Sequence, residues 1–325
     1  MQNLVDNDFR PGLIYPKFCH FWQALGFLFY FLLCFAGTSF AGPLTIDNAA
    51  AEPLAKGKWD IEFHYTYYDM SVVKNTAYWG YAQGNGHMDS MSGHDMKYLN
   101  QVLLYETYYG FTDRLTAGIV VPYFLRDVRK QPFAGNEEVS SNGNGDIALR
   151  ACYNLFDPAK NFIGISLGTA LGLPTGDKNY DPPLGDGRYE TCLATIFTRI
   201  FNDKSKGHLT LSYKWRFRNK NYEYWAMYSG ITVGNEFHYG LVGEYAATKK
   251  INLFLEASGW MAPKSKFSGG GKIPYTDYFR AEVIPGVQYK ATKNMTLEFC
   301  LKVPVKKDTD FDFNIAPEIG AVFSF

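Results

Sequence analysis

The sequence lacks an excess charge of either sign, and beyond its first 45 residues it lacks any long apolar run. Its 32 basic and 32 acidic residues give a formal net charge of +0. Nucleic acid is therefore not an expected partner, because phosphate binding needs a concentrated basic surface. A spanning helix needs about 20 apolar residues, so the body of the chain is not expected to cross a membrane as helices.

Cysteine is also scarce. Of five cysteines, three lie beyond residue 41, namely Cys152, Cys192 and Cys300. Three well-separated cysteines do not make a disulfide framework in an exported chain, so we interpret them as isolated packing residues. Nothing in the sequence indicates a cofactor.

The N-terminal segment has the features of a signal peptide. Residues 21–37 are apolar, and Ser39 and Ala41 place small residues where a signal peptidase reads them. This predicts a signal peptide over 1–41, a linker over 42–57 and one domain over 58–325. A retained membrane anchor is the alternative, because the leading segment is long and carries Asp6 and Asp8.

Residues 208–218 alternate between apolar and polar side chains. Leu209, Leu211 and Tyr213 fall on one parity, and His208 and Thr210 on the other. An extended strand places these two sets on opposite faces, so the segment is predicted to be a β-strand.

This pattern recurs along the chain. We predict twelve strands, at about 59–68, 97–109, 114–125, 146–155, 162–173, 188–201, 208–218, 231–245, 251–261, 278–289, 295–305 and 313–325. Long and short connections alternate between them. Soluble strands typically have about 5 to 6 residues, whereas tilted membrane-spanning strands need about 9 to 11, so the lengths favour a membrane.

A sheet in lipid must close on itself, because no backbone group can stay unpaired there. The fold class is therefore predicted to be all-β, an antiparallel up-and-down transmembrane β-barrel of the Gram-negative outer membrane. The terminal Phe325 resembles the signal read by the barrel assembly machinery. Both termini and the short turns are then expected in the periplasm, and the long loops outside.

The polar parity carries the charged side chains, which must face the lumen. On the lipid face, each Arg or Lys would cost roughly 2 to 4 kcal/mol at the midplane. The predicted lumen-lining charged wall consists of Arg199, Lys214, Arg216, Arg218, Glu236, His238, Glu244, Glu62, His64 and Glu318. Two interpretations stay open: opposed charges that select and orient a solute, or ion pairs that fill the interior.

The sequence also contains candidate metal ligands and a candidate catalytic pair. The first long loop holds His87, Met88, Met91, His94 and Met96, whose thioether and imidazole groups suit soft metal ions, although their spacing is irregular. A flexible polar loop is the alternative. No lipase or protease constellation is recognisable, because His208 and Ser212 share a face but lie about 13 Å apart along a strand.

Several segments resemble a known family, the outer-membrane channels or transporters associated with the meta-cleavage pathway of phenol degradation. They are Gly172-Leu173-Pro174-Thr175-Gly176-Asp177, Asn144-Gly145-Asp146, Gly110-Phe111-Thr112-Asp113-Arg114-Leu115, Val121-Pro122-Tyr123 and Pro285-Gly286-Val287-Gln288-Tyr289. The resemblance covers about 58–325. It implies a barrel that passes small aromatic or apolar molecules, and it brings no binding residues.

These observations predict a porin-like channel that is integral to the outer membrane and lets small solutes pass passively, with hydrophobic or aromatic molecules among the candidates. Its expected partners are these solutes, membrane lipid and lipopolysaccharide, and the barrel assembly machinery. Two alternatives are an outer-membrane enzyme that hydrolyses lipid or peptide, and a plugged barrel that serves as a surface binding protein or scaffold.

Overall fold

The computed structural model describes residues 53–72, 97–130, 137–177, 184–185, 187–217, 234–264, 266, 278–308 and 311–325. The predicted signal peptide over 1–41 lies outside these residues, and so do Arg218 and the loop with His87, Met88, Met91, His94 and Met96. Among the described residues, no helix is long and apolar enough to cross a membrane.

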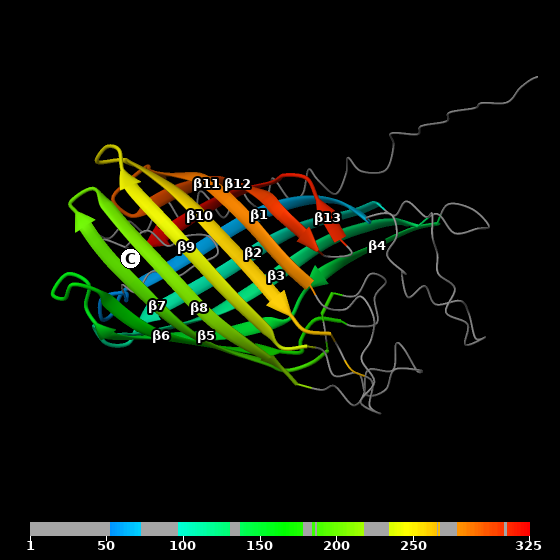
Figure 1. The fold of residues 1–325 in the computed structure, drawn as a ribbon, viewed down its shortest axis with the longest axis horizontal. Helices are drawn as coiled ribbons and strands as arrows, with labels where there is room; N and C mark the ends of the chain where they lie inside the picture. Colours follow the sequence, from blue (N-terminus) through cyan, green and yellow to red (C-terminus); the bar gives the residue numbers. More distant parts are fainter. Residues whose placement is uncertain are drawn as a thin grey trace, which may run out of the picture. The chain divides into compact units, whose positions relative to one another are not determined.

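The described part of the chain forms one antiparallel sheet (Figure 1). Its strands are β1 (Trp59–Val72), β2 (Lys97–Gly110), β3 (Leu115–Lys130), β4 (Glu137–Asn144), β5 (Ile147–Phe156), β6 (Gly164–Leu173), β7 (Glu190–Asn202), β8 (Ser205–Arg216), β9 (Glu236–Ala246), β10 (Ile251–Ala262), β11 (Tyr278–Lys290), β12 (Met295–Asp308), β13 (Phe311–Phe313) and β14 (Ala316–Ser324).

The sheet closes into a barrel. Neighbours in sequence pair along the sheet, and β1 pairs with both β2 and β14. At the seam, Trp59 and Phe325 exchange two backbone hydrogen bonds of 3.2 and 2.9 Å. The predicted closed all-β barrel is confirmed.

Several strands, such as β1, β3 and β12, extend further than the sequence pattern predicted, and two of the twelve barrel strands are each formed by two segments. β4 continues β5 along β3, and β13 continues β14 along β1. The sequence pattern predicted a loop over 126–144, between the strands at 114–125 and 146–155, and this prediction was wrong for the part that β3 and β4 occupy. An exposed ion pair of 3.1 Å joins Arg129 to Glu138 there. Both faces of this hairpin are largely polar, so no apolar alternation marked it.

Side-chain burial follows the predicted parity. On β8, Leu209 and Leu211 are 37% and 38% exposed on the outer face, whereas His208 and Thr210 are 3% and 6% exposed inside. On β1, Asp60, Glu62 and His64 are likewise buried. The barrel therefore has an apolar outer face and an interior that holds most of the buried polar side chains.

Candidate functional site

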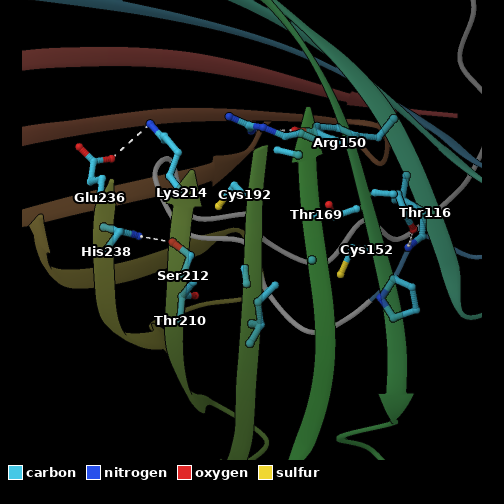
Figure 2. A pocket seen from close by; sticks show the side chains of 18 of the residues that line it. Thr116, Arg150, Cys152, Thr169, Cys192, Thr210, Ser212, Lys214, Glu236 and His238 are labelled. Atoms are coloured by element: carbon cyan, nitrogen blue, oxygen red, sulfur yellow. Dashed lines mark hydrogen bonds and ion pairs between the residues drawn. The ribbon is translucent and has the colours of Figure 1, made fainter. Parts of the chain in front are cut away.

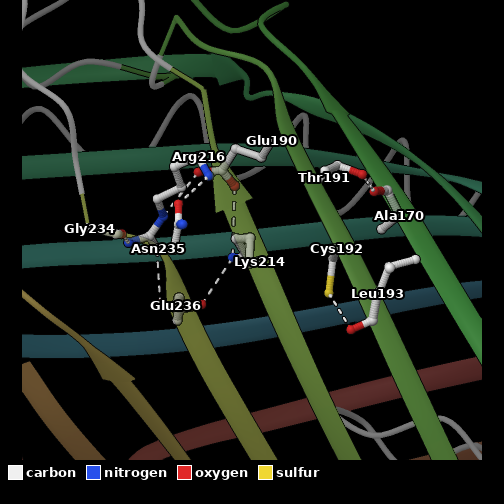
Figure 3. A network of polar contacts seen from close by, with 10 residues as sticks. All are labelled: Ala170, Glu190, Thr191, Cys192, Leu193, Lys214, Arg216, Gly234, Asn235 and Glu236. Carbon is white, nitrogen blue, oxygen red and sulfur yellow. Dashed lines mark hydrogen bonds and ion pairs between the residues drawn. The ribbon is translucent and has the colours of Figure 1, made fainter.

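The centre of the predicted charged wall is a compact ion-pair network (Figure 3). Lys214 Nζ lies 3.2 Å from Glu236 Oε1, and Arg216 Nη2 lies 2.9 Å from Glu236 Oε2. Glu190 on β7 also contacts both cations, with Arg216 Nε 3.2 Å from its Oε1. Acids from the two neighbouring strands thus neutralise the cations of β8, instead of forming an opposed wall across the lumen.

Arg199 does not belong to this wall. Thr198 pairs with His208 and points inward, whereas Arg199 pairs with Gly207 and lies on the outer face. The Arg199 Cζ lies 3.8 Å from the Phe162 ring centroid and 5.4 Å from that of Phe201. The prediction that Arg199 lines the lumen was wrong, because a charge on the apolar parity was assigned to the polar one.

His238 lies inside the barrel between β8 and β10. Its Nδ1 is 3.4 Å from Ser212 Oγ, and its ring stacks on Trp260 at 4.9 Å. The hydroxyl–imidazole distance is long for a base that would activate a nucleophile. The geometry therefore gives His238 the role of an aromatic wall residue.

Glu244 belongs to a belt of buried polar side chains around the short-turn end of the barrel. His208 Nε2 lies 3.1 Å from Glu244 Oε1, and Asn252 donates to Glu244 at 3.3 Å. Asn252 donates to Gln288 at 2.9 Å, and Gln288 donates to Glu298 at 2.7 Å. Side chains from β8 to β12 are thereby linked in one chain of hydrogen bonds.

Glu62, His64 and Glu318 extend this belt across the seam. The His64 ring nitrogens lie 3.3 Å from Glu62, 3.8 Å from Glu298 and 3.6 Å from Glu318. Lys302 Nζ pairs with Glu318 at 3.0 Å. Such a buried network of ion pairs and hydrogen bonds holds its strands in register more than it offers free charge to a solute.

An apolar cluster lies inside the barrel beside this belt. Val242, Phe254, Ile284 and Cys300 come from β9 to β12, and each is at most 4% exposed. Cys300 is thus a packing residue, as predicted. The cluster packs on the inner face of β9 to β12, and belt residues such as Glu244 and Gln288 line a cavity at the short-turn end.

The inner face of β5 to β8 lines a cavity, shown from close by in Figure 2. The cavity measures about 380 Å³, and residues outside these strands, such as Leu54, Asp60, His238 and Trp260, also line it. Gly168, Ala170 and Ala194 face it, and these side chains are too small to fill it. The small residues of β6 are visible in the sequence. The cavity was not predictable, because it also depends on the pairing that places Ala194 of β7 beside Gly168.

Arg150 is the cavity residue whose importance the sequence did not reveal. Its Nη1 donates to Glu106 Oε2 and to the Tyr108 hydroxyl, each at 3.0 Å. Cys152 and Cys192 also line the cavity as free thiols. The interpretation of these two cysteines as packing residues is therefore corrected.

Metal binding has no support in the described part of the chain. No group of three or more His, Cys, Asp or Glu side chains there could hold a metal ion. The predicted loop with His87 and His94 lies outside the described residues.

Among solved structures, the COG4313 outer membrane channel from Pseudomonas putida F1 superposes with a TM-score of 0.65 at 17% identity, covering 86% of this chain and 100% of the other. Lower similarity is found for the Ralstonia pickettii toluene transporter TbuX, with a TM-score of 0.43 at 14% identity over 89% and 94% of the two chains. The first likeness supports the fold. No curated protein sequence matches the chain.

The match that identifies the chain is to a family model. The family is described as "Putative MetA-pathway of phenol degradation", and its model matches residues 90–310. This range covers more than half of the chain and most of the barrel strands. The predicted resemblance is confirmed, and the chain belongs to this phenol-degradation family.

Proposed function

We propose that the protein is an outer-membrane channel through which small solutes pass passively, with aromatic and apolar molecules as its solutes. The observation that carries this proposal is the cavity of about 380 Å³ inside a closed barrel. Small-molecule sites typically enclose roughly 300 to 1,000 Å³, so the cavity suits a solute of that size.

The outer face supports a membrane location. Leucines such as Leu193, Leu241 and Leu255 are 55%, 58% and 55% exposed on it. Aromatic rings gather at the short-turn end, where Trp59 lies 4.6 Å from Tyr109. An apolar band bordered by aromatic rings is typical of transmembrane barrels.

The same end of the barrel is proposed to face the periplasm. Trp59 and Phe325 meet there, beside short turns such as 111–114 and 203–204. Outer-membrane barrels have short periplasmic turns and longer external loops. A signal peptide over 1–41 and a C-terminal Phe325 that engages the assembly machinery complete this proposal.

The route through the barrel is off-centre. The apolar cluster packs on the inner face of β9 to β12, and the small residues of β6 and β7 leave space on the other side. A solute would therefore move along β5 to β8, between an apolar wall and the Lys214–Glu236 pair.

Planar bilayer recording and liposome swelling test the proposal. Purified protein should give discrete conductance steps, and liposomes that contain it should swell in solutions of phenol-sized solutes. A silent bilayer with impermeable liposomes would overturn the proposal. Hydrolysis of lipid or peptide by that silent protein would instead support the enzyme alternative.

A further inference from the structure

Two cations line the cavity, and each is more exposed than the acids that pair with it. The Arg150 side chain is 46% exposed, against 6% for Glu106. The Lys214 side chain is 35% exposed, against 9% for Glu236 and 24% for Glu190. A solute in the cavity therefore meets the donors of these pairs before it meets their carboxylates.

Arg150 has N–H donors that its contacts with Glu106 and Tyr108 do not use. Within the described residues, its contacts to Glu106 and Tyr108 both use Nη1. A guanidinium carries five N–H donors in a planar fork, which matches the two oxygens of a carboxylate. Arg150 and Lys214 lie in one row with Ala170 and Cys192 across β5 to β8, and Figure 2 shows both cations at the same end of the cavity.

The surface between the two cations suits a flat apolar body. Gly168, Ala170 and Ala194 leave the wall of β6 and β7 without projecting side chains. At the other side of the cavity, the Trp260 ring stacks on His238 with an interplanar angle of 26°. Aromatic rings favour such flat apolar and aromatic surfaces.

A second cavity, at the short-turn end of β7 to β12, is also lined by cations. It measures about 320 Å³, and its lining includes Lys204, Lys206, Lys249, Lys250, Lys290 and Lys293. Its acids are Asp203, Glu244 and Glu298; Glu244 is bonded to His208 and Asn252, and Glu298 to Gln288. A mouth lined by cations raises the local concentration of anions.

From these observations we propose that the lumenal cavity binds small aromatic carboxylates, with the carboxylate received by Arg150 and Lys214 and the ring lying against Gly168, Ala170 and Ala194. This inference rests on the proposed channel function and names the class of solute. A cationic aromatic solute would require the acids to be the exposed partners, which they are not.

The native thiols of Cys152 and Cys192 provide a direct test, because both line the cavity. The probes are two methanethiosulfonates, one carrying a sulfonate and one a trimethylammonium group. Relative to their rates with a free thiol, the sulfonate should label these cysteines about tenfold or more faster, since a cationic site concentrates anions. A Cys152→Ser/Cys192→Ser variant gives the background from other cysteines. Equal rates, or faster labelling by the cation, would overturn the proposal.

Protection from labelling identifies the ligand. Benzoate should slow the labelling of Cys192, and benzyl alcohol at the same concentration should not. Lys214→Gln should weaken benzoate protection about tenfold or more, because a hydrogen bond to a charged group is lost. Arg199→Gln removes a cation from the outer face and should leave protection unchanged. Equal protection by both probes, or unchanged protection in Lys214→Gln, would count against the site.

The two proposals fail in different ways. If benzyl alcohol and benzoate cross liposomes at the same rate and neither protects the thiols, the channel function stands and the carboxylate site is refuted. If benzoate protects the thiols but no solute crosses the liposomes, the site stands and passive transport is refuted.

Discussion

Thr198 Oγ1 lies 2.8 Å from His208 Nδ1, and both side chains are buried inside the barrel. This pair fixes which face of β7 looks into the lumen. Arg199, the next residue, consequently lies on the outer face between the rings of Phe162 and Phe201. It can extend its charged group toward the membrane surface while its stem stays among apolar side chains.

Replacing Arg199 should therefore affect stability and leave ion selectivity intact. We expect Arg199→Gln to lower the free energy of unfolding by about 0.5 to 1 kcal/mol through the lost cation–π contacts. Urea unfolding in lipid vesicles measures this loss. The reversal potential under a salt gradient should equal that of the wild type, and a shift would place Arg199 in the ion path after all.

Glu236 should control the ion selectivity, because it contacts both Lys214 and Arg216. Glu236→Gln leaves two lumenal cations with one fewer acid, so the channel should become more selective for anions, by roughly twofold or more in permeability ratio. Arg216→Gln should shift the ratio toward cations.

The matched control for these variants is Glu138→Gln. Glu138 also pairs with an arginine, but both side chains are 63% exposed on the β3–β4 hairpin. Its removal should leave the reversal potential unchanged, because exposed charges are screened by salt. A shift as large as that of Glu236→Gln would show that the lumenal pairs have no special role.

Ala170 and the next residue, Leu171, allow a test of the route. Ala170 faces the cavity, whereas Leu171 is 40% exposed on the outer face. Ala170→Trp should lower the unitary conductance by about half or more, because it fills the path. Leu171→Trp introduces the same side chain toward lipid and should leave conductance near the wild-type level. If both variants conduct equally, solutes do not pass along β6.

Gly286 is predicted to be intolerant of a side chain. A Cβ at this position would overlap the Phe254 ring of the apolar cluster. Gly286→Ala should cost about 1 to 3 kcal/mol of unfolding free energy, because Phe254 must move within a packed cluster. Gly243→Ala is the control, since a Cβ there meets nothing within 4 Å. Equal urea midpoints for the two variants would contradict this packing.

The parity of the strands made most of the fold predictable. In β8, strict alternation alone assigned Leu211 to the outer face and Thr210 to the interior, and burial agrees. The alternation within β7 would have placed Arg199 correctly, because Leu193 and Phe197 share its parity and face outward. A charge was assumed to point inward, whereas a long side chain near a membrane surface can be accommodated outside.

The partners inside the lumen were not predictable in the same way. That Lys214 meets Glu190 and Glu236 depends on the register of three strands, which a single sequence does not give. The belt through Asn252 and Gln288 has the same origin, since it joins residues 36 positions apart. The β4 strand was not predicted because it lacks the apolar alternation by which the other strands were found.

The bonds between Trp59 and Phe325 also bear on how the barrel is made. Because β1 pairs with β14 at the seam, β1 gains its second neighbour only when nearly all of the barrel strands are in place. Until then, β1 and the last strand added each have an unpaired edge, which can pair with another chain. We therefore expect a chaperone to cover both edges and prevent aggregation until β1 and β14 pair.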